Sequence, residues 1–163
     1  MTTLIEGFPP VVNDGARLLI LGSFPSVQSL AVRQYYANPQ NVFWPITGAL
    51  FGFDETAPYE ARLVALQSHG VALWDVLHKC RRDGSSDAKI DPKTVVANNF
   101  VQLFTVYPTI TQVYFNGDKA ATLFRRLVRV DGPVRYQRLP STSTARAMRL
   151  ADKLALWREI MQS

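Results

Sequence analysis

The chain has 163 residues, enough for one folded domain, and its 47% hydrophobic and 19% charged residues exclude an intrinsically disordered protein. No apolar stretch is long enough to span a membrane, and the first residues lack the basic and apolar segments of a secretory signal. The one cysteine, Cys80, excludes an internal disulfide, and neither it nor the two histidines has neighbours spaced as metal ligands. We therefore expect a cytoplasmic protein with no metal, no organic cofactor and no membrane partner.

The positive charge of the chain is concentrated at its C-terminal end. The net charge is +5; residues 117–163 carry 10 basic and 4 acidic side chains, whereas residues 1–116 carry 8 basic and 9 acidic ones. This asymmetry favours a polyanionic partner such as nucleic acid. A generally basic, soluble surface would give the same numbers, so charge alone does not decide between the two interpretations.

The first half of the chain alternates short apolar runs with segments of helical spacing. An apolar run that ends at Gly22 predicts a buried strand entering a loop. Pro45 is tolerated only in the first turn of a helix, so a helix is expected to begin close before it. The predicted elements are a strand at 17–22, a helix from 41–44 to about residue 51, a helix at 59–68, a strand at 71–77 and an exposed loop at 79–92.

The second half of the chain continues the same alternation. The predicted elements are a helix at 96–106, a strand at 112–116, a basic amphipathic helix through residue 128, a strand at 134–139, a loop at 140–144 and a C-terminal helix. The last helix carries an apolar stripe that we expect to pack on the sheet, made of Leu150, Leu154, Trp157 and Met161. Hydroxyl side chains in the loop at 140–144 are candidate caps for this helix.

Strands that alternate with helices predict a single three-layer α/β domain over residues 1–163. We expect a central four-stranded parallel sheet with helices on both faces. In such folds, ligands bind at the carboxyl ends of the strands. Polar loops at 22–26, 116–119 and 140–146 fall there, which predicts one site built from all three.

These loops carry amide, hydroxyl and aromatic groups rather than a familiar catalytic motif. The chain has no phosphate-binding glycine loop, no dinucleotide-binding glycine motif and no His-Glu-x-x-His metal motif. Amide, hydroxyl and aromatic side chains suit a reaction in which binding and positioning of the substrate supply most of the catalysis. Hydrolysis of an N-glycosidic bond in DNA is such a reaction, because the base must be flipped out, stacked and read while water is held beside the sugar.

Four motifs also follow one another along the chain: Gly22-Ser-Phe-Pro-Ser26, Tyr35-Tyr-Ala-Asn-Pro-Gln-Asn-Val-Phe-Trp44, Phe115-Asn-Gly117 and Leu139-Pro-Ser-Thr-Ser-Thr-Ala-Arg146. From about residue 17 to 160, the chain resembles the uracil-DNA glycosylase superfamily. It is most similar to the hypoxanthine-DNA (deoxyinosine) glycosylases, with the mismatch-specific uracil and thymine glycosylases next.

The resemblance implies a monofunctional DNA glycosylase of base-excision repair, located in the prokaryotic cytosol or nucleoid. Such an enzyme hydrolyses the glycosidic bond of a flipped deaminated base in DNA, here hypoxanthine first and uracil more weakly. We expect a monomer whose partner is DNA that contains the deaminated base. No lysine occupies a position that the family uses for Schiff-base chemistry, so strand cleavage is not expected.

The resemblance and the positions at strand ends imply roles for single residues. Asn41 is the expected catalytic amide, and Tyr36 is expected to stack on the extruded base. The other expected base-binding residues are Ser23, Phe24, Asp75 and Asn116. The expected DNA-binding residues are Ser26, Ser141, Thr142, Ser143 and Arg146, and Arg146 matches a side chain that wedges into the duplex.

Several of these residues have a second explanation. Asn41 precedes a helix and could serve only as its N-cap, while Ser141 and Ser143 could cap the C-terminal helix. Arg146 would lie one turn into that helix, where the helix dipole disfavours a cation, so its charge favours a DNA contact.

Phe24 stands where uracil-excising relatives place a catalytic Asp or Asn, which predicts weak uracil excision. The same residue favours a rival hypothesis, a catalytically silent nucleic-acid-binding domain of this fold. A mismatch-specific uracil or thymine glycosylase is the other alternative.

Overall fold

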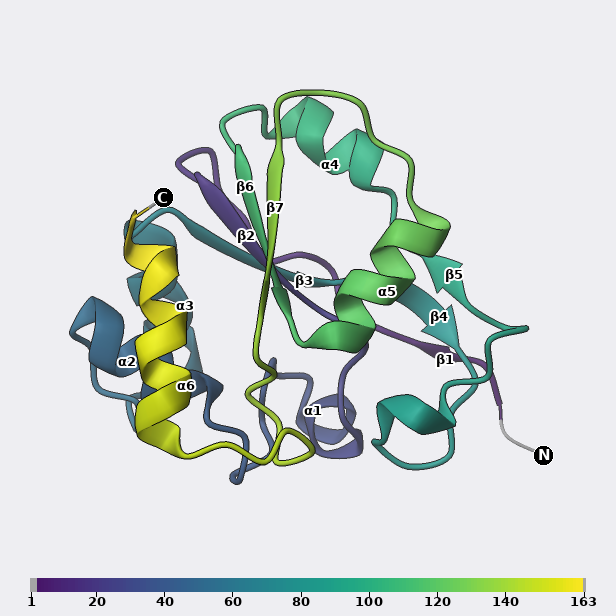
Figure 1. Ribbon diagram of the computed structural model, residues 1–163, viewed down its shortest axis with the longest axis horizontal. Coiled ribbons are helices and arrows are strands. Elements are labelled where there is room, and N and C mark those ends of the chain that lie inside the picture. The colour runs from purple at the N-terminus through teal and green to yellow at the C-terminus, as the bar shows by residue number, and fades with distance from the viewer. Residues whose placement is uncertain (1–2, 163) are drawn as a thin grey trace.

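The computed structural model describes residues 3–162, and a four-stranded parallel sheet forms its centre (Figure 1). The strands, in their spatial order, are β3 (Val71–Asp75), β2 (Leu18–Gly22), β6 (Gln112–Asn116) and β7 (Arg135–Leu139). All neighbouring pairs are parallel. Every residue of the first three strands is buried, whereas the edge strand β7 is exposed except at its last residue. The predicted fold class is confirmed.

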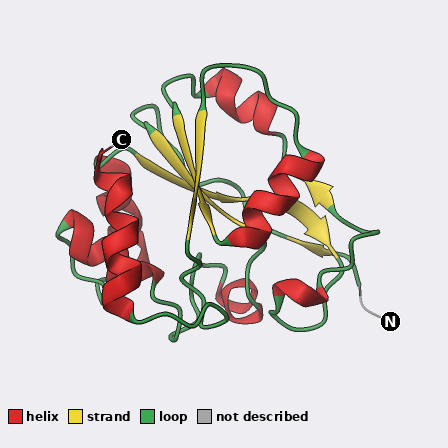
Figure 2. Cartoon of the chain, in the orientation of Figure 1, coloured by secondary structure: helices red, strands yellow, loops and turns green. Residues whose placement is uncertain are grey.

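Helices cover both faces of this sheet, as Figure 2 shows by the red elements on either side of the yellow strands. One side holds α2 (Phe43–Phe51), α3 (Tyr59–Ser68) and α6 (Leu150–Trp157), and the other holds α4 (Phe100–Val106) and α5 (Asp118–Leu127). Because side chains alternate along a strand, β2 contributes to both cores. Its Leu18 and Ile20 pack on the side of α2, and its Leu19 and Leu21 on the side of α5.

A second, smaller sheet was not expected from the sequence. It is antiparallel and contains β1 (Ile5–Glu6), β4 (Leu77–Cys80) and β5 (Val96–Ala97), with β4 in the middle. The prediction of one strand at 71–77 was therefore wrong, because the chain leaves the parallel sheet after Asp75 and enters the second sheet at Leu77. The predicted helix at 96–106 begins only at Phe100, where Asn99 Oδ1 accepts a hydrogen bond from Gln102 N at 3.0 Å.

The segment at 79–92 is also more ordered than an exposed loop. It contains the end of β4, the 3₁₀ helix η1 (Asp87–Lys89) and a bridge between Arg82 and Ile90. Cys80, Arg82 and Ile90 are buried. Because most residues of the segment are polar, its hydropathy did not indicate that these three side chains are buried.

The C-terminal helix begins later than expected. It starts at Leu150 with Arg149 at the N-cap position, so Ser141 and Ser143 do not cap it and Arg146 precedes it in a turn. The argument from the helix dipole at Arg146 was therefore wrong.

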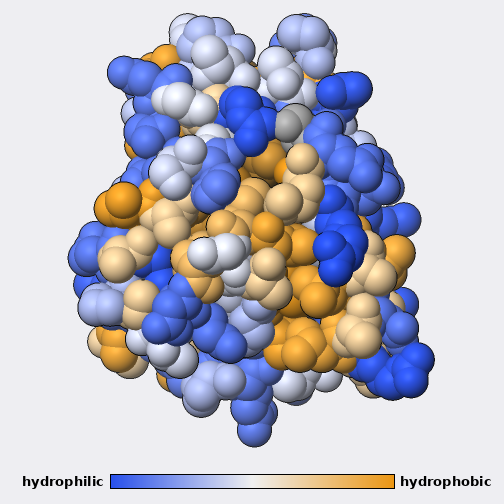
Figure 3. All heavy atoms as spheres, turned by 90° about the vertical axis from the view of Figure 1, so that its left-hand side faces the viewer, coloured by the Kyte–Doolittle hydropathy of each residue, from blue (hydrophilic) through white to orange (hydrophobic). Residues whose placement is uncertain are grey.

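The expected apolar stripe of α6 is only half buried. Trp157 is fully buried and Leu154 partly so, but Leu150 and Met161 are 49% and 50% exposed. After Trp157 the chain tightens into the 3₁₀ helix η2 (Arg158–Gln162), which turns Ile160 inward in place of Met161. Figure 3 looks onto this side of the molecule, where apolar side chains gather in the middle of the face inside a hydrophilic border.

One short helix completes the list of elements. The helix α1 (Val27–Val32) follows β2 and lies at the lower end of the sheet in Figure 1, where the loops after β2, β6 and β7 meet. No helix among residues 3–162 is both long and apolar enough to cross a membrane.

Candidate active site

The three polar loops predicted from the sequence meet in one pocket of about 900 Å³ at the carboxyl ends of the parallel strands. We call it the main pocket. All eleven predicted site residues line it. Further lining residues that the sequence analysis did not single out are Ser85, Ser86, Asp87, Asp118, Lys119 and Arg138.

The floor of the main pocket contains buried polar atoms without partners. Asp75 ends β3 beside Gly22 of β2, and its Oδ2 has no hydrogen-bond partner among the described residues. The buried hydroxyl of Tyr36 also has none. A Cβ at Gly22 would lie 2.6 Å from Asp75 Oδ1 and 3.3 Å from Tyr36 Oη, so only glycine leaves room for both groups. Unpaired buried polar atoms are costly, and their presence here indicates a site for a polar ligand.

Burial changes the protonation of both groups. It raises the pKa of Asp75 to about 7, with a further contribution from the negative charge of Asp87, while Arg82 acts in the opposite direction. Burial, and next to it the charge of Asp75, raises the pKa of Tyr36 above its ordinary range, while the nearby Asn116 side chain acts in the opposite direction although the two make no hydrogen bond of normal geometry. Asp75 is therefore neutral in most molecules below about pH 6 and in about half of them at pH 7, while the Tyr36 hydroxyl stays protonated.

Tyr36 has an unusual backbone conformation with φ at 56°, in the left-handed region that bulky residues rarely adopt. Its ring stacks on Phe43, with the ring centroids 4.0 Å apart and an angle of 17° between the planes. Among the four aromatic residues of the second motif it is the least buried. Phe43 thus supports one face of a ring that lines the pocket.

Asn41 makes a backbone contact and also lines the pocket. Its Oδ1 accepts a hydrogen bond from Phe43 N at 3.0 Å, in the first turn of α2. The formal N-cap residue, Val42, makes no such side-chain bond. The Asn41 amide nitrogen has no hydrogen-bond partner among the described residues and remains available at the pocket.

Asn116 holds the loop after β7 in place. Its Nδ2 donates to Thr142 Oγ1 at 3.0 Å, and Thr142 N donates to Asn116 Oδ1 at 2.9 Å. Thr142 is 1% exposed and its carbonyl accepts from Val42 N at 3.0 Å, so this loop is tied to the start of α2 as well. The buried Lys153, which the sequence analysis missed, donates from Nζ to Ser143 O at 3.0 Å. Asn116 and Thr142 are thus committed to the architecture of the loop.

The neighbouring serines form short turns. Ser141 Oγ accepts from Ser143 N at 3.1 Å, and Ser143 Oγ accepts from Ala145 N at 3.2 Å. Gly117 has φ at 97°, and a Cβ there would lie 2.9 Å from Ser141 Cβ. The strand-end glycine therefore lets the two loops approach each other closely.

The loop after β2 is braced by the segment between β4 and β5. Phe24 is 7% exposed and packs below the guanidinium of Arg82, which lies 5.2 Å from the ring centre. Arg82 donates from Nε to Gly84 O at 2.7 Å and from Nη2 to Pro25 O. Ser23 Oγ donates to Asp87 Oδ1 at 2.6 Å. No local sequence signal pairs these residues, because they come together only through the second sheet.

Ser26, an expected DNA contact, is the N-cap of α1. Its Oγ accepts from Ser29 N at 3.1 Å. Arg146 is exposed at the rim of the main pocket, together with the exposed Arg138 and the half-buried Lys119. Arg138 forms an ion pair with Asp118 at 3.6 Å.

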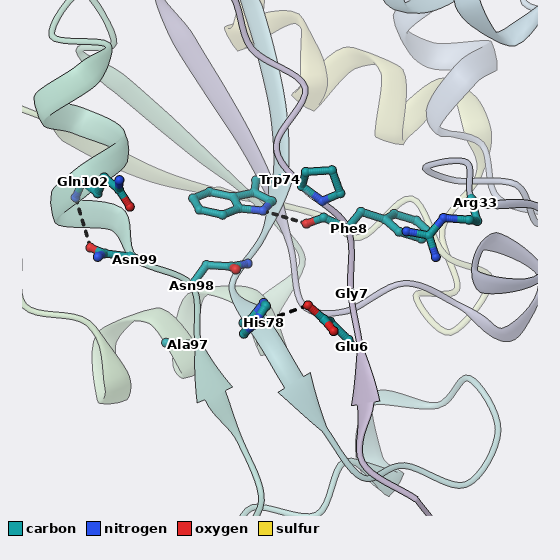
Figure 4. Close-up of a pocket in the computed structure, with 11 residues that line it drawn as sticks. Glu6, Gly7, Phe8, Arg33, Trp74, His78, Ala97, Asn98, Asn99 and Gln102 are labelled. Carbon is teal, nitrogen blue, oxygen red and sulfur yellow. Dashed lines mark hydrogen bonds and ion pairs between the residues drawn. The ribbon is translucent and has the colours of Figure 1, made fainter.

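A second pocket of about 570 Å³ lies beside the antiparallel sheet (Figure 4). Its polar groups are largely paired within the protein: Trp74 Nε1 donates to Phe8 O at 3.0 Å, and His78 lies 3.7 Å from Glu6. None of the predicted site residues lines it. Within residues 3–162, no group of three or more His, Cys, Asp or Glu side chains is placed to hold a metal ion.

The sequence is similar to those of two hypoxanthine DNA glycosylases. The chain is 35% identical over 155 residues to a hypoxanthine DNA glycosylase of Methanosarcina barkeri, covering 94% of this chain and 96% of the relative. It is 34% identical over 158 residues to a hypoxanthine DNA glycosylase of Methanosarcina acetivorans, covering 96% and 98%.

A solved structure shares the fold. The solution NMR structure of a candidate uracil DNA glycosylase from Methanosarcina acetivorans superimposes with a TM-score of 0.77 at 33% identity, over 98% of this chain and 99% of that chain. The profile of the uracil DNA glycosylase superfamily matches residues 9–162. The family predicted from the four motifs is confirmed: the chain belongs to the uracil DNA glycosylase superfamily.

Proposed function

We propose that this protein is a monofunctional DNA glycosylase that hydrolyses the glycosidic bond of a flipped hypoxanthine in DNA, and that of uracil more weakly. The observation that carries the proposal is the main pocket, which brings an amide, an aromatic ring and a buried carboxyl group together below a basic rim. The names of both curated relatives support the choice of hypoxanthine.

Asp75 and Tyr36 are the proposed base-reading residues. A neutral carboxyl group offers a donor and an acceptor side by side, which complements the N1–H and O6 edge of hypoxanthine. Burial raises the pKa of Asp75 to about 7, so the neutral form is available in about half of the molecules at pH 7 and in more of them below it. The ring of Tyr36 supplies a stacking surface, and stacking on an aromatic side chain contributes about 1–3 kcal/mol per base. A purine offers a larger face than uracil, so hypoxanthine should be favoured.

Asn41 is the proposed catalytic amide. Its oxygen is engaged by the backbone of α2, so the amide nitrogen is the group that can donate to the departing base or to the attacking water. The departing base gains negative charge as the bond breaks, and a donor already in place stabilises that charge.

Residues at the mouth of the pocket are proposed to grip DNA. Ser23 and Ser26 lie on the loop proposed to face the sugar, and Ser141 and Ser143 are proposed phosphate contacts. Arg146, exposed at the rim, is proposed to contact the opened duplex. Thr142 and Asn116, whose polar groups are used inside the protein, are proposed to shape this surface from behind.

Single-turnover release of the base from matched duplexes that carry hypoxanthine, uracil or mismatched thymine tests the proposal. We expect hypoxanthine to be released fastest and thymine slowest, without strand cleavage. Asn41→Ala should slow release a hundredfold or more, while the lost backbone bond lowers stability by only about 0.5–2 kcal/mol.

Asn13→Ala is the matched control, because Asn13 Oδ1 makes the same kind of turn bond, to Gly15 N at 3.0 Å, away from the main pocket. It should change stability alone. Release of uracil without hypoxanthine would contradict the proposed substrate. Tight binding of every duplex with no release would favour a catalytically silent DNA-binding domain.

A further inference from the structure

A carboxylate reaches the main pocket from a segment outside the four sequence motifs. In the loop after β2, the position at which uracil-excising relatives are expected to carry an acid or amide is Phe24, whose ring is buried. Asp87, in η1 between β4 and β5, lines the pocket instead. Its Oδ1 accepts a hydrogen bond from Ser23 Oγ at 2.6 Å. The adjoining loop therefore supplies the carboxylate that the first loop lacks.

The segment that carries Asp87 is fixed at several points. Arg82 binds the carbonyls of Gly84 and Pro25, and Val27 N donates to Ser85 Oγ at 2.8 Å. Ser86 caps η1 by accepting from Ala88 N. The bonds to Pro25 and Val27 attach the segment to the loop after β2 and to the start of α1, so the carboxylate is held in position before a substrate arrives.

Among the acidic residues that line this pocket, Asp87 is the one that is neither buried nor part of an ion pair between described residues. Three acidic residues line it. Asp75 is buried in the floor, where the neutral form is favoured, and Asp118 is paired with Arg138 at 3.6 Å. None of the ion pairs between described residues involves Asp87, and its Oδ2 has no hydrogen-bond partner there. Its charge also acts on the pocket interior, because it is one cause of the raised pKa of Asp75.

We propose that Asp87 is a catalytic residue that holds and deprotonates the attacking water. The inference rests on the proposed glycosylase activity. As the bond between C1′ and the base nitrogen breaks, its electron pair leaves with the base and the sugar becomes oxocarbenium-like. The water oxygen forms the new bond to C1′ and Asp87 Oδ2 accepts a proton from that water. The proton then passes to the departed base, which leaves the free base and an abasic sugar.

The first test is the rate of hypoxanthine release by Asp87→Asn under single-turnover conditions. The substitution keeps the shape of the side chain but removes its charge and basicity, and a positioned general base typically contributes a hundredfold to ten-thousandfold in rate. We expect a loss in that range with unchanged thermal stability. Asp131→Asn removes the same charge from an exposed loop outside the pocket and should leave the rate within about twofold of wild type.

The second test does not need turnover. A duplex with a pyrrolidine in place of the sugar carries a positive charge where the oxocarbenium ion would form, whereas a tetrahydrofuran in the same place is neutral. Wild type and Asp131→Asn should bind the pyrrolidine duplex at least tenfold more tightly than the tetrahydrofuran duplex. Asp87→Asn should lose that preference while keeping its affinity for the neutral duplex.

The outcomes separate this inference from the proposed function. If wild type releases no base, the proposed function fails, and the preference for the cation still tests Asp87. The inference is overturned if Asp87→Asn releases hypoxanthine within threefold of wild type, or if it prefers the pyrrolidine duplex as strongly as wild type does.

Discussion

Single residues of the main pocket combine a structural contact with a polar group that is still available. Asn41 is the clearest case, because its oxygen bonds to the first turn of α2 while its nitrogen lines the pocket. The sequence permitted a capping interpretation and a catalytic one, and this geometry makes them compatible. The sequence placed Asn41 just before a helix because Pro45 must lie in the first turn of α2.

Asp75 provides a prediction at this scale, the pH dependence of stability. Its pKa in the folded protein is about 7, above the ordinary value of 3.8. Between these values the folded protein holds a proton that the unfolded chain has lost, so stability falls as the pH rises from 4 to 7. Asp75→Asn cannot ionise and should escape this fall. The variant should therefore unfold like wild type at pH 4 but be more stable at pH 8, by a few kcal/mol at about 1.4 kcal/mol per pKa unit.

Urea unfolding at the two pH values measures this difference. Asp131→Asn, an exposed substitution of the same kind, should leave the pH dependence as it is in wild type. An equal difference between Asp75→Asn and wild type at pH 4 and pH 8 would show that the carboxyl group does not titrate in this range.

At the scale of elements, the parallel strands could be predicted and the antiparallel ones could not. β2, β3 and β6 are runs of five buried residues, which is the pattern of a strand covered on both faces. β1 and β5 have two residues each and take their conformation from pairing with β4. Hydropathy could not reveal that the chain changes sheets between Asp75 and Leu77, because the apolar run continues across the change.

The shape of the loop before α6 could not be predicted from the sequence either. Its serines follow the pattern of helix caps, but the chain remains irregular until Leu150. A bond from Asn116, at the end of β6, and one from Lys153, in α6 itself, hold the loop in that shape. Local preferences were overridden by tertiary contacts.

The segment between β4 and β5 should depend on Arg82. The side chain is 3% exposed and donates to two backbone carbonyls, those of Pro25 and Gly84. Arg82→Met keeps much of the apolar stem but leaves both carbonyls without this donor. We expect a loss of about 2 kcal/mol in the free energy of unfolding and slower base release, because the loop after β2 loses its brace.

Urea unfolding of Arg82→Met beside Arg81→Met measures the loss. Arg81 is the exposed neighbour in the chain, and its substitution should change stability by less than about 0.5 kcal/mol. Equal stabilities of the two variants would mean that Arg82 does not brace the segment.

For the whole molecule, the rule for parallel sheets predicted where the site would form. The loops after β2, β6 and β7 meet because these strands share a direction, and the pocket lies there. The segment with Arg82 and Asp87 arrives through the antiparallel sheet, so the same rule could not include it.

The structure shows which of the C-terminal cations lie together at the main pocket. The sequence places a net +6 on residues 117–163 without indicating which side chains act together. Lys119, Arg138 and Arg146 reach the rim of the main pocket. Other cations of this region do not line it, among them the exposed Arg125, Arg126 and Arg129.

Two triple variants with equal loss of charge test whether the rim is the DNA-binding surface. Each phosphate contact adds about 0.9 to the slope of log K against log salt concentration for duplex DNA. Replacing Lys119, Arg138 and Arg146 with alanine should therefore flatten the slope by about 2–3 and weaken binding most at low salt.

Replacing Arg125, Arg126 and Arg129 with alanine removes the same net charge away from the pocket and should change the slope by less than about 1. Fluorescence anisotropy with a labelled duplex between 50 and about 300 mM salt measures both. Equal slopes for the two variants would mean that the overall charge of the C-terminal region, and not the rim, attracts DNA.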